Sequence, residues 1–379
     1  MLTPEYLAGL SDDIVLLYDE LQNSIIEDMA RRIVKTGQMT DTAKWQAEML
    51  QNSGMLYDDI VNEIAGTTKL SAEEVKRLFT EAQVRTMDFD NEIYEEAGLK
   101  PLEKMSPAAL KVFYAGIRKT NGLIKNLTKT TANQAQQTYI NACTLAESQI
   151  ESGAFGYQQA IRNAVKTASI SGAYVRYPTG HKDRVDVAVR RAVLTGVGQT
   201  TGEISEENAI AMGCDLMEIT AHAGARPSHA AWQGKLVSLS GKKGYLDKRD
   251  IGYGTGPGFK GWNCRHDWYP FFEGISHRAY SNQRLKELSE KKVVYNDEEI
   301  GYYEATQKQR EMERQIRATR RELNGYTAAM EEADKSVKAE IQKDFDKAAI
   351  KLKRQEAAYK DFSYKIGLGP DPFRLQTTG

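Results

Sequence analysis

The chain has 379 residues, which is long enough for two or three domains that each bury a core. Lysine and arginine total 51 and aspartate and glutamate total 52, so the net charge does not predict a nucleic-acid or membrane partner, although a local charged patch still could. Three cysteines, at positions 143, 214 and 264, exclude a disulfide-rich scaffold and favour an origin in a reducing compartment.

The N-terminal segment MLTPEYLAGLSDD has no basic region followed by an apolar core, so we expect no secretory signal. No apolar run approaches the ~20 residues that a membrane-spanning helix needs. We therefore expect a soluble protein that is made in a cytoplasm and has no membrane partner.

The first half of the chain is predicted to be helical. Apolar residues at three- and four-residue steps predict a helix over 12–35 that ends at Gly37, and a shorter helix around Trp45 that ends at Gly54. A capping-box pattern at Ser71 begins the next helix. We take 1–105 as an N-terminal helical region.

Ser106 and Pro107 form an N-cap followed by a proline in the first turn, which predicts the start of another helix. Further helices are predicted over 132–150 and 158–170. We take 106–171 as a region of long helices.

The pattern changes near Gly172 to alternating short strands and helices. Strands are predicted over 173–178, 216–220 and 236–239, and a helix from Val185 is predicted to end at Gly196 and Gly198, before another over 203–212. A glycine- and lysine-rich stretch, 241–261, is predicted to be a long ordered loop. We take 172–280 as a compact α+β domain.

The last hundred residues are again helical and highly charged. A thin apolar stripe is interrupted at Asn324-Gly325 and resumes at Val337 with coiled-coil-like spacing. We take 281–379 as a helical hairpin or arm that ends in a loose tail from Gly367. The predicted fold class is mainly α with a central α+β domain.

The segment 256–261, GPGFKG, matches the glycine pattern of dinucleotide-binding proteins. That motif requires a strand before it and a helix beginning at its last glycine, and the flanking residues here predict neither. We therefore expect no nucleotide site, and we expect the glycines to let the loop fold back through positive φ angles.

Two pairs of metal-ligating residues flank this loop. His222 and His229 lie seven residues apart, and Cys264 and His266 lie two apart, so the second pair shares one face of an extended segment. Together these four residues form a candidate zinc set, although the spacing matches no standard zinc finger. The competing interpretation is that Cys264 is a buried apolar residue, that His229 binds a carbonyl, and that no cofactor is present.

An enzymatic interpretation uses the same residues. Cys264 could act as a thiolate nucleophile beside Arg265 and Asp267. Alternatively, His229, His266 and Asp267 could serve a hydrolase or nuclease through a metal-bound water. Nothing in the sequence supplies an oxyanion hole or a substrate pocket, so we expect no enzyme activity.

Arginines recur at three- and four-residue steps along a predicted C-terminal helix, so most of them share one face: Arg310, Arg314, Arg317, Arg320 and Arg321. Such a stripe could contact an acidic protein or nucleic-acid phosphates. Glutamates between the arginines favour instead a solvated face with internal salt bridges.

Three separated segments resemble the phage minor capsid protein 2 family: VDVAVRRAVLTGVGQTTGEIS (185–205), MGCDLMEITAHAGARPSHAAWQGK (212–235) and GYGTGPGFKGWNCRHDWYPFFEGIS (252–276). The second and third also resemble the head-morphogenesis proteins of Mu-type phages. The matching positions are Arg226, His229, Gly234, Gly261, Asn263, Cys264, Arg265 and His266. Where that wider group often has a second cysteine, this chain has His266.

This resemblance implies a structural virion protein, present in few copies and made in the host bacterial cytoplasm. It implies a place in a multi-copy assembly, with the portal protein or the major capsid protein, and with packaged DNA, as partners. It implies a role in head assembly and in DNA packaging or ejection, and it brings no catalysis. On this basis we interpret the two motif segments as a structural lock, in which Trp262, Trp268, Tyr269 and Phe271 cover the short strands.

Overall fold

A computed structural model of the chain describes residues 1–39, 41–172, 174–177 and 179–377. The described residues are mainly helical, with small antiparallel sheets, which confirms the predicted fold class. Among them, no helix is both long enough and apolar enough to cross a bilayer. Two predicted features reach outside the described part: the strand over 173–178 at both of its ends, and the tail at residues 378–379.

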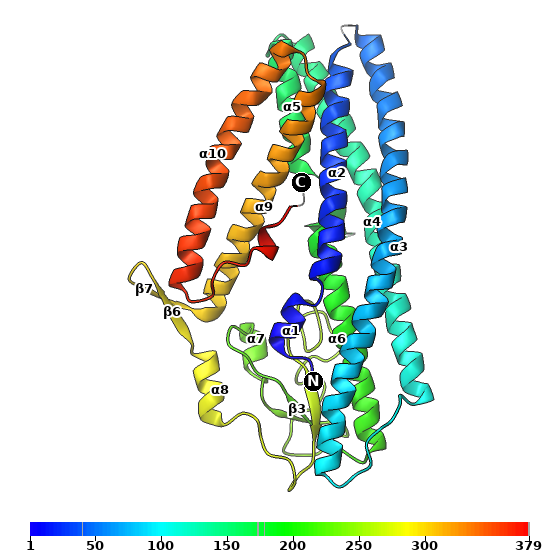
Figure 1. Ribbon diagram of the computed structural model, residues 1–379, viewed down its shortest axis with the longest axis vertical. Helices are drawn as coiled ribbons and strands as arrows, with labels where there is room; N and C mark the ends of the chain where they lie inside the picture. The colour runs from blue at the N-terminus through cyan, green and yellow to red at the C-terminus, as the bar shows by residue number, and fades with distance from the viewer. Residues whose placement is uncertain (40, 173, 178, 378–379) are drawn as a thin grey trace. The chain divides into compact units, whose positions relative to one another are not determined.

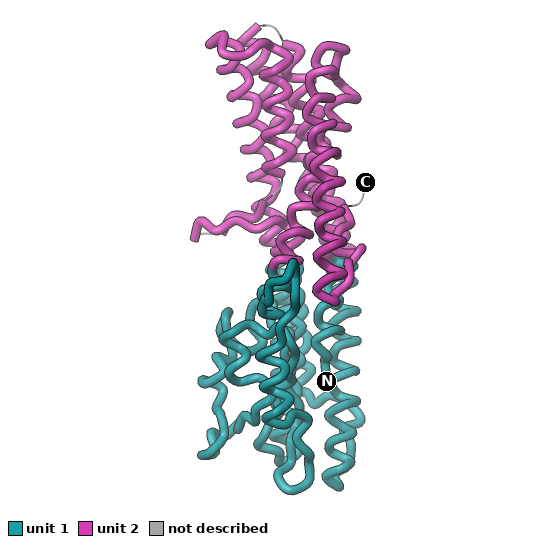
Figure 2. Tube along the Cα trace, turned by 90° about the vertical axis from the view of Figure 1, so that its left-hand side faces the viewer, with its two compact units in different colours: residues 1–14, 71–124, 190–307 teal, residues 15–70, 125–189, 308–379 magenta. Residues whose placement is uncertain are grey.

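The chain divides into two compact units, and each unit is assembled from three separated segments (Figure 2). Unit 1 consists of Met1–Ile14, Ser71–Ile124 and Arg190–Gln307, and unit 2 consists of Val15–Leu70, Lys125–Val189 and Lys308–Gly379. Several long helices contribute residues to both units. The four-part division inferred from the sequence stays a prediction.

Unit 2 contains long helices packed side by side (Figure 1). It contains all or most of α2 (Asp12–Gly37), α5 (Tyr157–Ser171), α9 (Tyr302–Glu332) and α10 (Lys335–Lys365), and parts of α3 (Thr42–Glu96), α4 (Pro107–Glu151) and α6 (Val185–Ala211). It also contains the strand pair β1 (Tyr174–Arg176) and β2 (Lys182–Arg184), and the short 3-10 helix η1 (Phe373–Leu375). Buried polar contacts join its helices: Thr36 Oγ1 of α2 lies 2.6 Å from Tyr139 Oη of α4.

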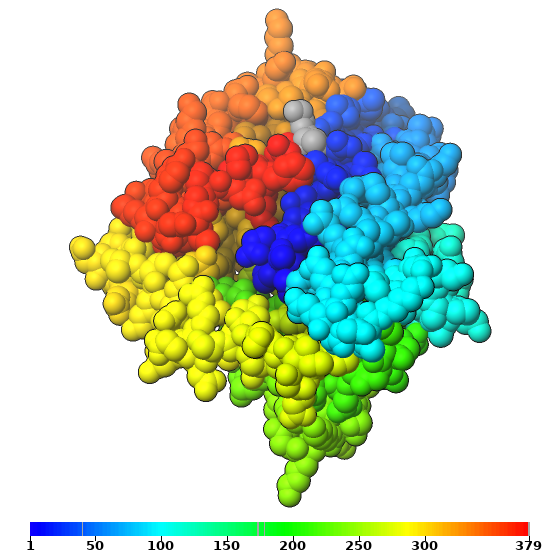
Figure 3. All heavy atoms as spheres, turned by 60° about the horizontal axis from the view of Figure 1, so that its bottom comes forward, coloured from blue at the N-terminus to red at the C-terminus, as the bar shows by residue number. Residues whose placement is uncertain are grey.

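Unit 1 contains a three-stranded antiparallel sheet in the order β4-β3-β5. Its further elements are α1 (Pro4–Gly9), β3 (Leu216–Ile219), α7 (Pro227–Ala230), β4 (Leu236–Ser238), β5 (Trp268–Phe271), α8 (Asn282–Ser289), β6 (Lys292–Tyr295) and β7 (Glu298–Gly301). In the space-filling view the N-terminal residues lie against α3 (Figure 3), where the Arg85 guanidinium sits 4.5 Å above the Tyr6 ring.

The core of unit 1 joins the sheet to α3 and α6. The fully buried Trp268 of β5 donates its indole N–H to the Gly202 carbonyl of α6 at 3.0 Å. Tyr269 packs edge-to-face on Phe89 of α3, with ring centroids 5.3 Å apart. The sheet is therefore a buried platform, and the connections between its strands carry the motif residues.

Several glycines that were predicted to end helices do not end them. α3 continues through Gly54 and through the capping box at Ser71, α6 continues through Gly196, and α9 continues through Gly325. The break near the C-terminus falls instead before α10, whose N-cap Asp334 accepts hydrogen bonds from the Ser336 and Val337 amides. In α6 and α9 these glycines meet another helix: a Cβ on Gly325 would lie 2.1 Å from Ser169 Oγ of α5.

The sequence reading also missed a hairpin. Strands β6 and β7 pair through a two-residue turn in which Asn296 and Asp297 both have positive φ angles, of 52° and 66°. Asparagine and aspartate between two short alternating segments are a recognised signal for such a turn.

Candidate metal centre

Three of the four predicted metal-ligating side chains meet beside the sheet. His229 lies on α7, in the connection between β3 and β4, while Cys264 and His266 lie directly before β5. Pro227 occupies the first turn of α7, and Gly234 ends the connection with a φ of +66°. The fold therefore brings two strand connections together, 35 residues apart in the chain.

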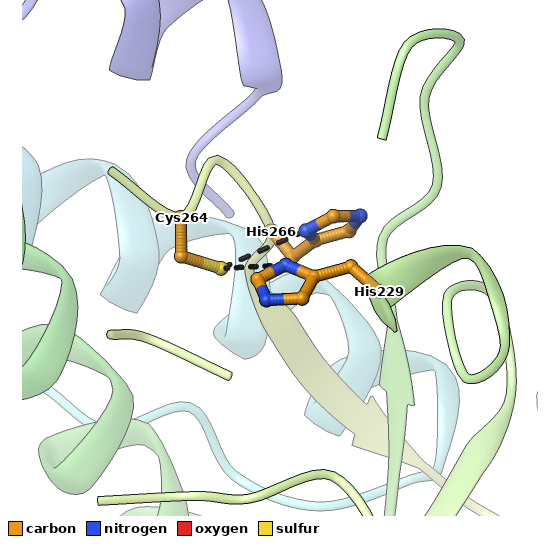
Figure 4. A group of neighbouring side chains, drawn as sticks. All are labelled: His229, Cys264 and His266. Carbon is orange, nitrogen blue, oxygen red and sulfur yellow. Dashed lines mark hydrogen bonds between the residues drawn. The ribbon is translucent and has the colours of Figure 1, made fainter. Parts of the chain in front are cut away.

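The three ligand atoms face one another (Figure 4). Cys264 Sγ lies 3.6 Å from His266 Nδ1 and 3.9 Å from His229 Nδ1. All three atoms lie within 4.8 Å of one another, and all three residues are buried. These three side chains could hold one metal ion, and we call them the candidate metal group.

The outer nitrogens of both histidines fix their tautomers. His229 Nε2 lies 2.8 Å from the Pro257 carbonyl, which can only accept, so Nε2 carries the proton and Nδ1 has a free lone pair. His266 Nε2 lies 3.2 Å from Gln233 Oε1. That amide oxygen also accepts a hydrogen bond from the His222 backbone N–H at 3.1 Å, which fixes the orientation of the Gln233 amide. Because an amide oxygen can only accept, His266 Nε2 must carry the proton.

His222, the fourth predicted ligand, lies beside the group but outside it. Its ring packs on that of His266 with centroids 4.5 Å apart, and its Nδ1 lies 2.9 Å from the Ala223 carbonyl. Its Nε2 is buried and has no hydrogen-bond partner. Like His229 and His266, His222 therefore has one ring nitrogen that hydrogen-bonds a carbonyl oxygen. Its other ring nitrogen keeps a lone pair that accepts no hydrogen bond.

Burial sets the protonation of the group. Desolvation raises the pKa of the Cys264 thiol and lowers the pKa of the His229 and His266 imidazoles. It also lowers the pKa of His222 to about 4, and the charge of Arg265 acts in the same direction. In the metal-free chain the thiol and the imidazoles are consequently neutral near pH 7.

The glycine-rich loop folds tightly, but mainly for a reason other than the predicted one. Of the segment 256–261, only Lys260 has a positive φ, of 58°. The glycines are needed for space: a Cβ on Gly258 would lie 2.0 Å from the Gly252 carbonyl oxygen, and one on Gly261 would lie 2.1 Å from that of Gly256. Here backbone packs directly on backbone, and no nucleotide motif is formed.

The remaining motif residues hold this loop. Arg226 donates to the Trp262 carbonyl at 3.1 Å, and the exposed Asn263 turns the chain with a φ of 55°. Arg265, between the two ligands, is half-buried. Trp268, Tyr269 and Phe271 are buried residues of β5 itself, whereas 55% of the surface of Trp262 is exposed.

Sequence reasoning missed a buried ion pair next to the candidate metal group. Lys260 Nζ contacts Asp267 Oδ1, and both side chains are 1% exposed. Asp267 Oδ2 also accepts the Leu2 backbone N–H at 2.6 Å. A lysine inside an apolar, glycine-rich run was the one available sign of this pair, and nothing in the sequence identified its partner.

Comparison with known proteins gives the family. A family model described as phage minor capsid protein 2 matches residues 2–363. The chain belongs to the phage minor capsid protein 2 family.

A curated relative supports the same assignment. The chain is 29% identical over 207 residues to a protein of Lactococcus phage LL-H named "Structural protein". The match covers 52% of this chain and 51% of the relative, so the chain spans about half the length of that protein. No solved structure matches the chain.

Most members of the predicted arginine stripe form ion pairs inside unit 2. Arg310 pairs with Glu313 at 3.0 Å, Arg320 pairs with Glu356 at 2.6 Å, and Arg317 lies 3.7 Å from Asp186. Arg321 is 1% exposed and pairs with Asp19 and Asp186. Arg314 is exposed, so it is the member of the stripe that an outside partner would meet most readily.

Proposed function

We propose that this chain is a minor structural component of the phage head, located at the portal vertex or on the inner capsid surface. In this role it assists head assembly and DNA packaging or ejection, as one of several copies. Its partners are the portal protein or the major capsid protein, with packaged DNA as a further contact. The observation that carries the proposal is the family match, which extends over residues 2–363.

The use of the motif residues supports a structural role. Arg226 and His229 bind loop carbonyls, and Gly258 and Gly261 allow close backbone contact. These interactions stabilise a loop on a sheet, and none of them presents a reactive group to solvent. The relative named "Structural protein" is consistent with this role.

A metal-dependent hydrolase or nuclease is the alternative, because three ligands without a fourth are typical of catalytic zinc. Access argues against it. His229, Cys264 and His266 are 3%, 8% and 2% exposed, which leaves a substrate no approach to a bound ion. Incubation of the zinc-supplemented protein with single- and double-stranded DNA tests this alternative, and cleavage that the Cys264→Ser variant lacks would establish it.

Cross-linking mass spectrometry on purified mature particles tests the proposed function. We expect the chain in the particles, cross-linked to portal or major capsid protein. Exposed lysines on the long helices, such as Lys129 and Lys347, provide attachment points. Absence from mature particles, together with no binding of the purified chain to portal rings or capsid shells, would contradict the proposal.

A further inference from the structure

We propose that His229, Cys264 and His266 bind one structural zinc ion, and that His222 completes the set as the fourth ligand. The ion would fasten the connection between β4 and β5, residues 239–267, to α7. The proposal rests on the geometry of these side chains and goes beyond the role in the phage head.

The distances fit zinc. Zn–S bonds of ~2.3 Å and Zn–N bonds of ~2.0–2.1 Å at a tetrahedral angle place sulfur and nitrogen about 3.6 Å apart. Cys264 Sγ lies 3.6 Å and 3.9 Å from the two Nδ1 atoms. Sub-ångström movements would therefore bring these sulfur–nitrogen separations to those of a zinc site.

Two Nδ1 atoms, of His229 and His266, face the Cys264 thiol, and both need a hydrogen-bond donor. A thiol has one hydrogen, so Cys264 can donate to only one of the two bare Nδ1 atoms. The other nitrogen would be buried without a partner, which is costly. A cation resolves this, since the thiolate and both nitrogens then direct lone pairs at one ion and the thiol proton is released to solvent.

The surroundings have the features of a metal site. Ligating histidines usually donate their other N–H to a carbonyl or carboxylate, which orients the ring. His229 does so to Pro257 and His266 to Gln233. One thiolate with imidazoles favours zinc over magnesium or calcium, which prefer oxygen ligands.

His222 is assigned as the fourth ligand because of its orphaned nitrogen. Its Nδ1 contacts the Ala223 carbonyl, so Nε2 keeps a lone pair that is buried and unpartnered. Nε2 lies outside the group of atoms within 4.8 Å, so this ring must move toward the ion. Four protein ligands give the closed coordination of a structural site.

The structural role follows from what the ion would join. The loop 241–261 has little regular structure and is held by turns and by close backbone contacts. Two of the ligands, Cys264 and His266, follow this loop, and the other two precede β4. The ion would therefore link the two ends of the 35-residue span from His229 to Cys264. Such a link would stabilise the loop by restricting its unfolded alternatives.

Metal analysis of the full chain tests the proposal. The protein is expressed in zinc-supplemented medium and purified without chelator, and its metals are measured by plasma mass spectrometry. We expect about one zinc per chain, falling below about a tenth of an equivalent in Cys264→Ser and His229→Asn. We expect at least ~10-fold weaker zinc binding in His222→Gln.

Matched controls separate ligation from folding. Cys214 is a buried cysteine in the same apolar cluster, with its thiol on the Leu216 and Phe271 carbonyls, so Cys214→Ser should keep the zinc even if it loses stability. His277 is exposed, and His277→Gln should behave like the unchanged chain. Equal zinc loss in Cys214→Ser and Cys264→Ser would overturn the ligand assignment.

Two measurements need no variant. Cobalt added to the metal-stripped chain should give the intense visible bands of tetrahedral cobalt and a thiolate charge-transfer band. Chelation of zinc should speed tryptic cleavage at Lys248 and Arg249, which lie in the loop. Metal-free purified protein that takes up neither ion, or iron or copper in place of zinc, would overturn the proposal, and unchanged affinity in His222→Gln would overturn the fourth ligand.

Discussion

At the scale of single residues, Asp90 of α3 shows how burial can keep a carboxyl group protonated. Asp90 Oδ2 accepts a hydrogen bond from the Ser205 hydroxyl at 2.6 Å, while Oδ1 has no hydrogen-bond partner. Desolvation raises the pKa of Asp90 to about 7, against an ordinary value of 3.8. Between these two values the folded chain therefore holds a proton that the unfolded chain has lost.

Ionisation of Asp90 makes the folded chain less stable as the pH rises. Because the folded-state pKa is raised, the contribution of Asp90 to stability is complete below pH 3.8 and declines as the pH rises to about 7. Asp90→Asn keeps the acceptor for Ser205 and removes this decline. We expect the variant to be more stable than the parent chain at pH 8, with the difference shrinking by up to ~1.4 kcal/mol per pH unit on acidification toward pH 4.

Urea unfolding at several pH values measures this effect. Asp88→Asn, at an exposed position on the same helix, is the control and should change stability by less than ~0.5 kcal/mol. A stability difference between Asp90→Asn and the parent that does not vary with pH would contradict the raised pKa.

The three residues of the candidate metal group were candidates from the sequence, whereas the groups that hydrogen-bond them were not. An i, i+2 spacing in an extended segment already placed Cys264 and His266 on one side. Gln233 and Pro257 act through an amide and a backbone carbonyl, which no motif reports. The position of His222 beside His266 depends on how the sheet connections fold, so it required the structure.

At the scale of elements, two helices of unit 1 approach closely through a reciprocal pair of small residues. A Cβ on Gly116 of α4 would lie 2.0 Å from Thr200 Oγ1 of α6, and one on Gly196 of α6 would lie 2.1 Å from Thr120 Oγ1 of α4. Each helix thus offers a glycine followed four residues later by a threonine. The threonines are β-branched and have few alternative rotamers in a helix.

Gly196→Ala should therefore destabilise the chain. Overpacking costs about 1–3 kcal/mol, which exceeds the gain of up to ~1 kcal/mol that alanine brings to a helix interior. Gly122→Ala on α4 is the matched control, because no atom lies within 4 Å of a Cβ built there. We expect Gly122→Ala to raise stability by roughly 0.5–1 kcal/mol, and thermal unfolding of both variants measures the contrast. Equal shifts would rule out the tight crossing.

These glycines also explain where element prediction succeeded and failed. Apolar periodicity identified helical segments but not their ends, since buried residues such as Leu56 and Ile60 continue at four-residue steps past Gly54. A glycine inside such a pattern either ends a helix or lets another helix approach. The sequence cannot distinguish these cases, because the neighbour that fills the space comes from a distant segment, as Thr120 does for Gly196.

At the scale of the whole molecule, each compact unit depends on segments from distant parts of the chain. In unit 2, Arg321 of α9 pairs with Asp19 of α2, 302 residues earlier, and lies 3.5 Å from Asp186 of α6. Asp186 also accepts a hydrogen bond from the Gln22 side chain at 2.9 Å. The buried Arg321 guanidinium therefore links α9 to α2 and α6, and its positive charge offsets the charges of Asp19 and Asp186.

The pKa shifts of the two carboxyl groups differ in this network. Burial alone would raise the pKa of Asp186, but Arg321 and Arg317 hold it below its ordinary value. Burial raises the pKa of Asp19, because Arg321 offsets only part of the desolvation. Loss of Arg321 would leave both carboxyl groups without their main counter-charge.

Arg321→Met should consequently destabilise the chain by about 3–5 kcal/mol at neutral pH, the typical cost of breaking a buried ion pair from one side. The loss should shrink on acidification, because both carboxyl groups would then have raised pKa values and would bind protons in the folded state. Asp19→Asn in the same chain should restore part of the stability, since it removes one uncompensated charge.

Arg314→Met provides the comparison, because Arg314 is exposed on the same helix and its loss should change stability by less than ~0.5 kcal/mol. The same two variants separate folding from binding. If the stripe contacts DNA or a capsid partner, Arg314→Met should weaken that binding while leaving the unfolding midpoint in urea unchanged. A similar loss of stability in both variants would show that Arg321 does not have the buried, compensating role inferred here.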